Sequence, residues 1–233
     1  MKIIKNEKLI ERNSKIGNWS NIGGLLALLA AIYISFARPE WFNYSIIAML
    51  IGFILTQVSL YMGNRFGRSP RPDELLDANL KGLSTEFAIY HFVTPVSHLL
   101  VGPAGMWVLL PYRQMGVISY QKNHWKMSRG GFIQGYMRLF GQEGLGRPDA
   151  DANAETKAIT AFLSRHMEES QIPTIQSVAV FTSDKVELQT EEAPIPTVKL
   201  KQLKEFMRQK AKGRLLSPSE VERIKAALPQ AEE

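Results

Sequence analysis

Two long stretches without a charged residue, at positions 16–37 and 41–64, constrain this chain more than any other feature. Each is about as long as the roughly twenty residues that a helix needs to cross a hydrocarbon core. Only Arg38, Pro39 and Glu40 separate them, so no domain fits between them. Aromatic residues near the ends of the two stretches, where an interfacial belt would place them, are Trp19, Phe36, Trp41, Phe42, Tyr44 and Tyr61. The sequence therefore predicts a hairpin of two transmembrane helices.

Two other interpretations of these stretches are weaker. Buried helices of a soluble core usually carry a polar face, and these stretches have almost none. A cleaved signal peptide has a shorter apolar region and is not followed at once by a second span. We therefore expect residues 1–64 to form a basic tail and a membrane hairpin, with spans at about 16–37 and 41–64.

The flanking basic residues set the expected orientation. Lys and Arg are frequent before the first stretch and within residues 65–72 after the second, whereas the connection has only Arg38. Because Lys and Arg are retained on the cytoplasmic side, the sequence predicts a multi-pass protein of the cell (inner) membrane with both termini in the cytoplasm. Residues 65–72 are expected to be a short, stiff linker at the membrane surface.

The remainder is predicted to be a cytoplasmic α/β (α+β) domain over residues 73–212, followed by a C-terminal helix and tail over 213–233. Apolar arms around Gly102-Pro103-Ala104-Gly105 predict a β-hairpin, and residues 117–120 with Trp125 are expected to extend its sheet. Residues 126–150 hold six glycines and are expected to be a loop insertion. Helices are expected from Pro72, over 155–169, over 200–212 and from Ser217, and further strands over 87–93, 174–181, 186–188 and 197–198.

Composition excludes several classes of site. The chain has no cysteine, which rules out disulfides, cysteine-ligated metal centres and cysteine nucleophiles. Its net charge of +6 is divided equally between residues 1–64 and 65–233, so the domain is only mildly basic and nucleic-acid binding is possible but not favoured. The four histidines do not have metal-ligand spacing, so we expect core or surface roles for them and no metal site: they are His91, His98, His124 and His166.

Residues 97–109, Ser-His-Leu-Leu-Val-Gly-Pro-Ala-Gly-Met-Trp-Val-Leu, resemble the hairpin of the nuclease-related domain (NERD) family. That family's pattern is an acid-bearing helix, then D-H-h-h-h-G-P-x-G-h-h-h-h-E-x-K with h apolar, then an N-P-x-x-Q helix and a V-V-F strand. Residues 153–157 stand at the start of the second helix, and residues 178–181 at the strand. The resemblance covers roughly residues 72–211 and implies a restriction-endonuclease-like fold.

The family's catalytic positions are mostly lost. Glu74 matches the acid of the first helix, but Ser97 stands where the family has a metal-binding aspartate. Leu110 stands at the glutamate and Tyr112 at the lysine. Because leucine cannot coordinate Mg²⁺ and a serine hydroxyl poorly replaces a carboxylate, the resemblance implies a degenerate site, with no catalytic residues, cofactor or metal expected.

These observations predict a membrane-anchored, catalytically inactive nuclease-related protein that acts as an interaction or scaffold module at the cytoplasmic membrane face. Its expected partners are membrane lipid and a protein that the sequence cannot name. The alternative is a membrane-tethered, Mg²⁺-dependent nuclease or nucleic-acid-binding protein with a rearranged site, built from Glu74 with Glu86 or Asp77. Carboxylates from elsewhere that point to the end of the hairpin would favour this alternative.

Two segments are candidate contact surfaces. An apolar set with basic neighbours, which has the composition of an interfacial helix, is a candidate for docking on the membrane surface or on the domain's flank: Phe132, Tyr136, Leu139 and Phe140. A basic set around the 200–212 helix is a candidate for anionic lipid or phosphate, although an ordinary solvated helix face is the favoured interpretation: Lys199, Lys201, Lys204, Arg208, Lys210, Lys212 and Arg214.

Overall fold

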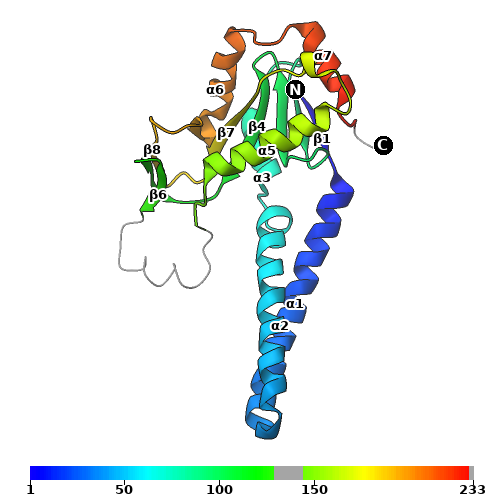
Figure 1. Ribbon diagram of the computed structural model, residues 1–233, viewed down its shortest axis with the longest axis vertical. Helices are drawn as coiled ribbons and strands as arrows, with labels where there is room; N and C mark the ends of the chain where they lie inside the picture. Colours follow the sequence, from blue (N-terminus) through cyan, green and yellow to red (C-terminus); the bar gives the residue numbers. More distant parts are fainter. Residues whose placement is uncertain (129–143, 231–233) are drawn as a thin grey trace. The chain divides into compact units, whose positions relative to one another are not determined.

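The computed structural model describes residues 1–128 and 144–230 (Figure 1). The chain forms two units. One is Glu7–Glu74, and the other combines Met1–Asn6 with Leu75–Glu233.

The Glu7–Glu74 unit is a helical hairpin. Helix α1 spans Glu7–Ala37 and helix α2 spans Phe42–Met62, joined by a 3₁₀ turn at Pro39–Trp41; a π-helical turn, η2, follows at Gly63–Gly67. The predicted pair of long apolar helices with a short connection is confirmed, and by length and composition both helices could cross a membrane. The basic segment before residue 16 is helical rather than a separate tail, because α1 already begins at Glu7.

Small residues at seven-residue spacing bring the two helices together. The buried residues of α1 are Ile10, Gly17, Gly24 and Ala31. Gly24 lies against Gly52 of α2, and Gly17 lies against Met62 and Gly63. The Ser45 hydroxyl of α2 donates to the Ala31 carbonyl at 2.8 Å. A Cβ on Gly52 would lie 2.7 Å from Leu28 Cγ and 3.1 Å from the Gly24 carbonyl oxygen. Small residues therefore allow the close backbone approach that is typical of helix pairs in membranes.

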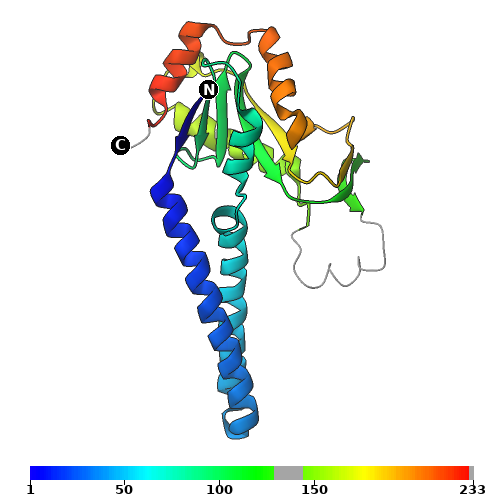
Figure 2. The ribbon, with the colours of Figure 1, turned by 180° about the vertical axis from the view of Figure 1, so that it is seen from behind.

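The α/β unit is built on a six-stranded mixed sheet in the order β1-β2-β3-β4-β7-β9 (Figures 1 and 2). Its strands are β1 (Lys2–Lys5), β2 (Ala88–His91), β3 (His98–Gly102), β4 (Gly105–Tyr112), β7 (Ile175–Phe181) and β9 (Thr197–Lys199). The β2, β3 and β4 strands form an antiparallel meander, and β7 runs parallel to β4. The β-hairpin predicted around residues 102–105 is confirmed by the antiparallel pairing of β3 with β4. Glycine is required at both ends of its turn, because Gly105 has a φ of 99° and a Cβ on Gly102 would lie 2.4 Å from the Phe87 ring.

Helices cover both faces of this sheet. Helices α3 (Pro72–Leu80) and α6 (Leu200–Lys212) share a core with Ile89, Leu100 and Trp107. Helices α5 (Pro148–Leu163) and α7 (Pro218–Ala227) pack with the opposite-facing residues, such as Leu99 and Val108. Because both faces are buried, these strands read as nearly continuous apolar runs rather than alternating ones.

The N-terminal strand β1 was not anticipated from the sequence. It pairs in parallel with β2, with Ile4 opposite Tyr90, and the Lys2 amide donates to the Phe87 carbonyl at 2.9 Å. Ile4 is 1% exposed in the core shared with α5 and α7. The first residues of the chain are therefore part of the same folded domain as residues 75–230.

Other predictions need correction. Residues 117–120 and Trp125 do not extend the main sheet; they belong to β5 (Gly116–Gln121) and β6 (His124–Ser128), which form a separate three-stranded sheet with β8 (Val186–Gln189). Helix α5 starts at Pro148, seven residues before the expected start, because Pro148 at its first turn and Asp149 and Asp151 behind it are favourable there. A short 3₁₀ turn at Glu169–Gln171 follows it. By contrast, α6 has the predicted bounds.

Candidate functional site

Each of the four positions that the family resemblance singled out has its own local environment. Leu110, near the end of β4, is 6% exposed and lies in the core with α5 and α7. Extending the β3–β4 register by two residues, from the pair Leu99 and Val108, places Ser97 opposite Leu110.

Tyr112 ends β4 and is tied to α5. Its hydroxyl donates to Asp151 Oδ2 at 2.8 Å, and its ring stacks on Phe181 with centroids 5.5 Å apart. Burial and then this hydrogen bond raise the pKa of Tyr112 far above its usual value. A neutral, partly buried phenol cannot replace the charge of a lysine at this position.

Carboxylates of α5 do lie near this strand end. Asp151 accepts from Tyr112, and Asp149 accepts from Trp125 Nε1 at 3.0 Å. Although partial burial opposes it, the hydrogen bond and charge of Arg147 lower the pKa of Asp149. Within residues 1–128 and 144–230, however, no three or more His, Asp or Glu side chains are grouped so that they could hold a metal ion.

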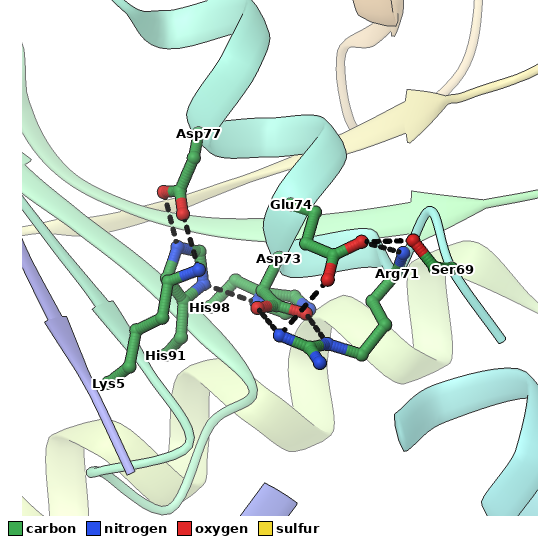
Figure 3. A network of polar contacts seen from close by, with 8 residues as sticks. All are labelled: Lys5, Ser69, Arg71, Asp73, Glu74, Asp77, His91 and His98. Carbon is green, nitrogen blue, oxygen red and sulfur yellow. Dashed lines mark hydrogen bonds and ion pairs between the residues drawn. The ribbon is translucent and has the colours of Figure 1, made fainter. Parts of the chain in front are cut away.

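Glu74 is held in the first turn of α3, where a carboxylate is favoured by the helix dipole. It accepts from the Ser69 hydroxyl and from the Arg71 amide, both at 2.9 Å, and pairs with the Arg71 guanidinium at 3.2 Å (Figure 3). Arg71 also pairs with the buried Asp73 at 3.0 Å. These contacts give Glu74 a structural role at the start of the helix.

A buried polar network that the sequence did not predict joins four elements of the α/β unit (Figure 3). His91 on β2 and His98 on β3 have Nδ1 atoms 2.7 Å apart, and both side chains are at most 2% exposed. His91 Nε2 lies 3.0 Å from Asp77 Oδ1 on α3, and the other Asp77 oxygen pairs with Lys5 of β1. The expected core role for His91 and His98 is thereby confirmed, and no metal-ligand spacing could have revealed their pairing.

The two histidine rings meet through their Nδ1 atoms, so one ring must donate and the other accept. The chain of contacts runs from Lys5 through Asp77 and His91 to His98. It links β1, α3, β2 and β3, so its evident effect is to hold the N-terminal strand at the edge of the sheet.

The basic candidate set around α6 is largely engaged within the domain. Lys204 Nζ donates to the Lys81 carbonyl at 2.6 Å, and Arg208 donates to the Gly82 carbonyl at 3.3 Å. Lys201 pairs with Asp184 at 2.8 Å, Arg214 lies 3.7 Å from Glu86, and the Lys210 ammonium lies 5.4 Å from the Phe206 ring centroid. Lys199 and Lys212 lie at the last position of β9 and of α6. The surface left for an anion is smaller than the sequence predicts.

The apolar candidates Phe132, Tyr136, Leu139 and Phe140 lie outside the described residues, so the expected docking segment stays a prediction. Comparison with known proteins adds no relative: no family model, no curated protein and no solved structure matches the chain significantly.

Proposed function

We propose that this chain is a membrane-anchored protein whose helical hairpin crosses the bilayer and whose α/β domain serves as a binding or scaffold module in the cytoplasm. The observation that carries the proposal is the exposed apolar surface of the Glu7–Glu74 unit. Phe36 is 84% exposed and Leu26 60%, and exposed Leu, Ile and Phe side chains continue along both helices. Such a surface is costly in water, and a hydrocarbon core would cover it.

The pairing of β1 with β2 supports the hairpin topology. Because Lys2–Lys5 hydrogen-bonds within the same sheet as residues that follow the hairpin, both ends of the hairpin must emerge on one side of a membrane. An even number of spans satisfies this requirement. The excess of Lys and Arg at these ends favours the cytoplasm for that side.

The arrangement of the α/β domain supports a nuclease-related fold without nuclease activity. The acid-bearing helix α3, the β3–β4 hairpin, helix α5 and strand β7 follow one another as in the resemblance, and β7 lies directly beside β4. The position of the family's glutamate is filled by Leu110 in an apolar core. This combination favours a domain that binds a partner over one that cleaves a phosphodiester.

Membrane fractionation tests the anchor. The full chain should remain in the pellet after alkaline carbonate and high-salt washing and should be released by detergent. Reporter fusions at the two termini should both give cytoplasmic signals. Recovery of the intact chain in the carbonate supernatant would overturn the anchor, and reporters on opposite sides would overturn the hairpin.

The alternative of a membrane-tethered, Mg²⁺-dependent nuclease rests on the acids of α5 near Tyr112. Purified protein should not cleave DNA or RNA with Mg²⁺ or Mn²⁺. Metal-dependent cleavage that is lost in Asp151→Asn but kept in the surface variant Asp184→Asn would replace the scaffold proposal with the nuclease.

A further inference from the structure

The Glu7–Glu74 unit contains an open cavity of about 460 Å³. It lies between the start of α1 and the η2 turn that follows α2. It is lined by Glu7, Ile10, Glu11, Ser14, Lys15, Phe66, Gly67 and Arg71. Ser14 and Lys15 directly precede the first uncharged stretch, and Phe66 and Gly67 follow the second within η2. The cavity therefore lies at the level where a hydrocarbon core would give way to lipid headgroups.

Two features of this cavity define its ligand chemistry. Its lining is strongly polar: it carries two carboxylates and two cationic groups, of which Glu11 and Lys15 pair with each other at 2.6 Å. Ile10 and Phe66, at 2% and 6% exposure, supply an apolar part. The Arg71 guanidinium is held by ion pairs with Asp73 and Glu74 through Nε and Nη2, so it is oriented before any ligand arrives.

A ligand that fits must have a positive and a negative group close together, followed by an apolar part. A purely anionic headgroup would meet Glu7 and Glu11, and a purely cationic one would meet Lys15 and Arg71. A phosphate beside the cations and a primary ammonium beside the carboxylates satisfies both pairs. Carboxylates accept hydrogen bonds from a primary ammonium. A quaternary trimethylammonium has no N–H group and cannot donate such a bond.

We propose, on the basis of the membrane anchor above, that this cavity binds the headgroup of a zwitterionic phospholipid with a primary amine, of the phosphatidylethanolamine class. The phosphate contacts Lys15 and Arg71, and the ammonium contacts Glu7 and Glu11. The glyceryl ester and acyl chains extend past Phe66 onto the apolar surfaces of α1 and α2.

Native mass spectrometry of the full chain, released from nanodiscs with equal amounts of two lipids, tests this site. Dioleoylphosphatidylethanolamine should be retained about tenfold over dioleoylphosphatidylcholine, the difference that one hydrogen bond to a charged group supplies. The double variant Glu7→Gln, Glu11→Gln should bring that ratio close to one. Glu40→Gln, which removes a carboxylate at the other end of the hairpin, should leave the ratio unchanged.

A second variant separates the two halves of the headgroup. Lys15→Gln should lower the retention of both lipids and keep their ratio, because it removes a phosphate contact common to both. Phosphatidylglycerol, which has the phosphate but no amine, should be retained no better than phosphatidylcholine.

Equal retention by the wild type, a preference for phosphatidylglycerol, or an unchanged ratio in the double variant would each overturn the site. These results would leave the anchor intact, since they require a chain embedded in the nanodisc. Release of the chain by carbonate would instead overturn the anchor and this site together.

Discussion

His91 and His98 are direct partners across the β2–β3 pair, and their Nδ1 atoms share a hydrogen bond of 2.7 Å inside the sheet. One ring must donate and the other accept. Two fully protonated rings could not make this contact. The pair therefore depends on at least one neutral imidazole, with Asp77 and Lys5 completing the polar chain toward β1.

His98→Ala should destabilise the protein because it leaves His91 Nδ1 buried without this partner and removes the edge contact with the Phe92 ring, 5.0 Å away. The free energy of unfolding should fall by about 1–3 kcal/mol, measured by denaturant titration of the full chain in detergent. His124→Ala, at an exposed histidine, is the control and should change the free energy of unfolding by less than about 0.5 kcal/mol. Equal effects would contradict a structural role for the pair.

Ile4→Ala should cost about 2–5 kcal/mol, since it opens a cavity beside a side chain that is 1% exposed. Ile3→Ala changes a neighbour in the same strand that is 45% exposed, and should be nearly neutral. Hydrogen exchange should show loss of protection at β1 and β2 only in the first variant. Indistinguishable variants would mean that β1 does not belong to the sheet.

Gly52→Ala should weaken the hairpin by about 1–3 kcal/mol, because the new methyl group would crowd Leu28 and the Gly24 carbonyl. Gly63→Ala is a matched control, since a Cβ there meets nothing within 4 Å. In a titration with sodium dodecyl sulfate, the helical circular dichroism signal of Gly52→Ala should begin to fall at a lower mole fraction of the detergent than that of the wild type. A lower onset for Gly63→Ala would argue against the packing described.

Leu110→Glu should unfold the domain or lower its melting temperature sharply, because it buries a carboxylate among apolar side chains. Leu215→Glu, at a leucine that is 53% exposed, should be tolerated. Differential scanning calorimetry compares the two. Metal-stimulated cleavage by a well-folded Leu110→Glu protein would show that the position can still serve as a nuclease site.

Glu220 gives a pH dependence at α7. The Ser217 side chain and amide lower its pKa below the usual 4.5, so its contribution to stability is present above pH 4.5 and is lost as the pH falls through the lowered value. Glu220→Gln should therefore be less stable than the wild type at pH 7, and this difference should be smaller at a pH below 4.5. Ser217→Ala, which removes the helix cap, should cost about 1 kcal/mol at pH 7. An unchanged gap at both pH values would exclude the carboxylate as the cause.

Features that depend on one contiguous segment could be predicted from the sequence. The uncharged stretches predicted the two apolar helices, the basic segment 200–212 predicted α6, and Ser217 predicted the start of α7. Each signal lies within one contiguous segment.

Long-range pairing could not be predicted in the same way. Lys2–Lys5 is too short to show a strand period, and only the register of β2 against β3 brings His91 to His98. The acids of α5 reach Tyr112 because β7 and α5 return to β4. These contacts depend on the fold as a whole, and no spacing along the chain encodes them.

The parallel pairing of Lys2–Lys5 with Ala88–His91 joins two strands that lie far apart in the sequence, and both long helices belong to the segment between them. During synthesis the first strand leaves the ribosome long before its partner exists, and it must wait unpaired while the helices are made. An inserting chain that carried its N-terminus across the bilayer would separate the two strands permanently. If the hairpin crosses a membrane as proposed, the sheet can form only when both helices insert together as a loop, so folding of the domain depends on that insertion route.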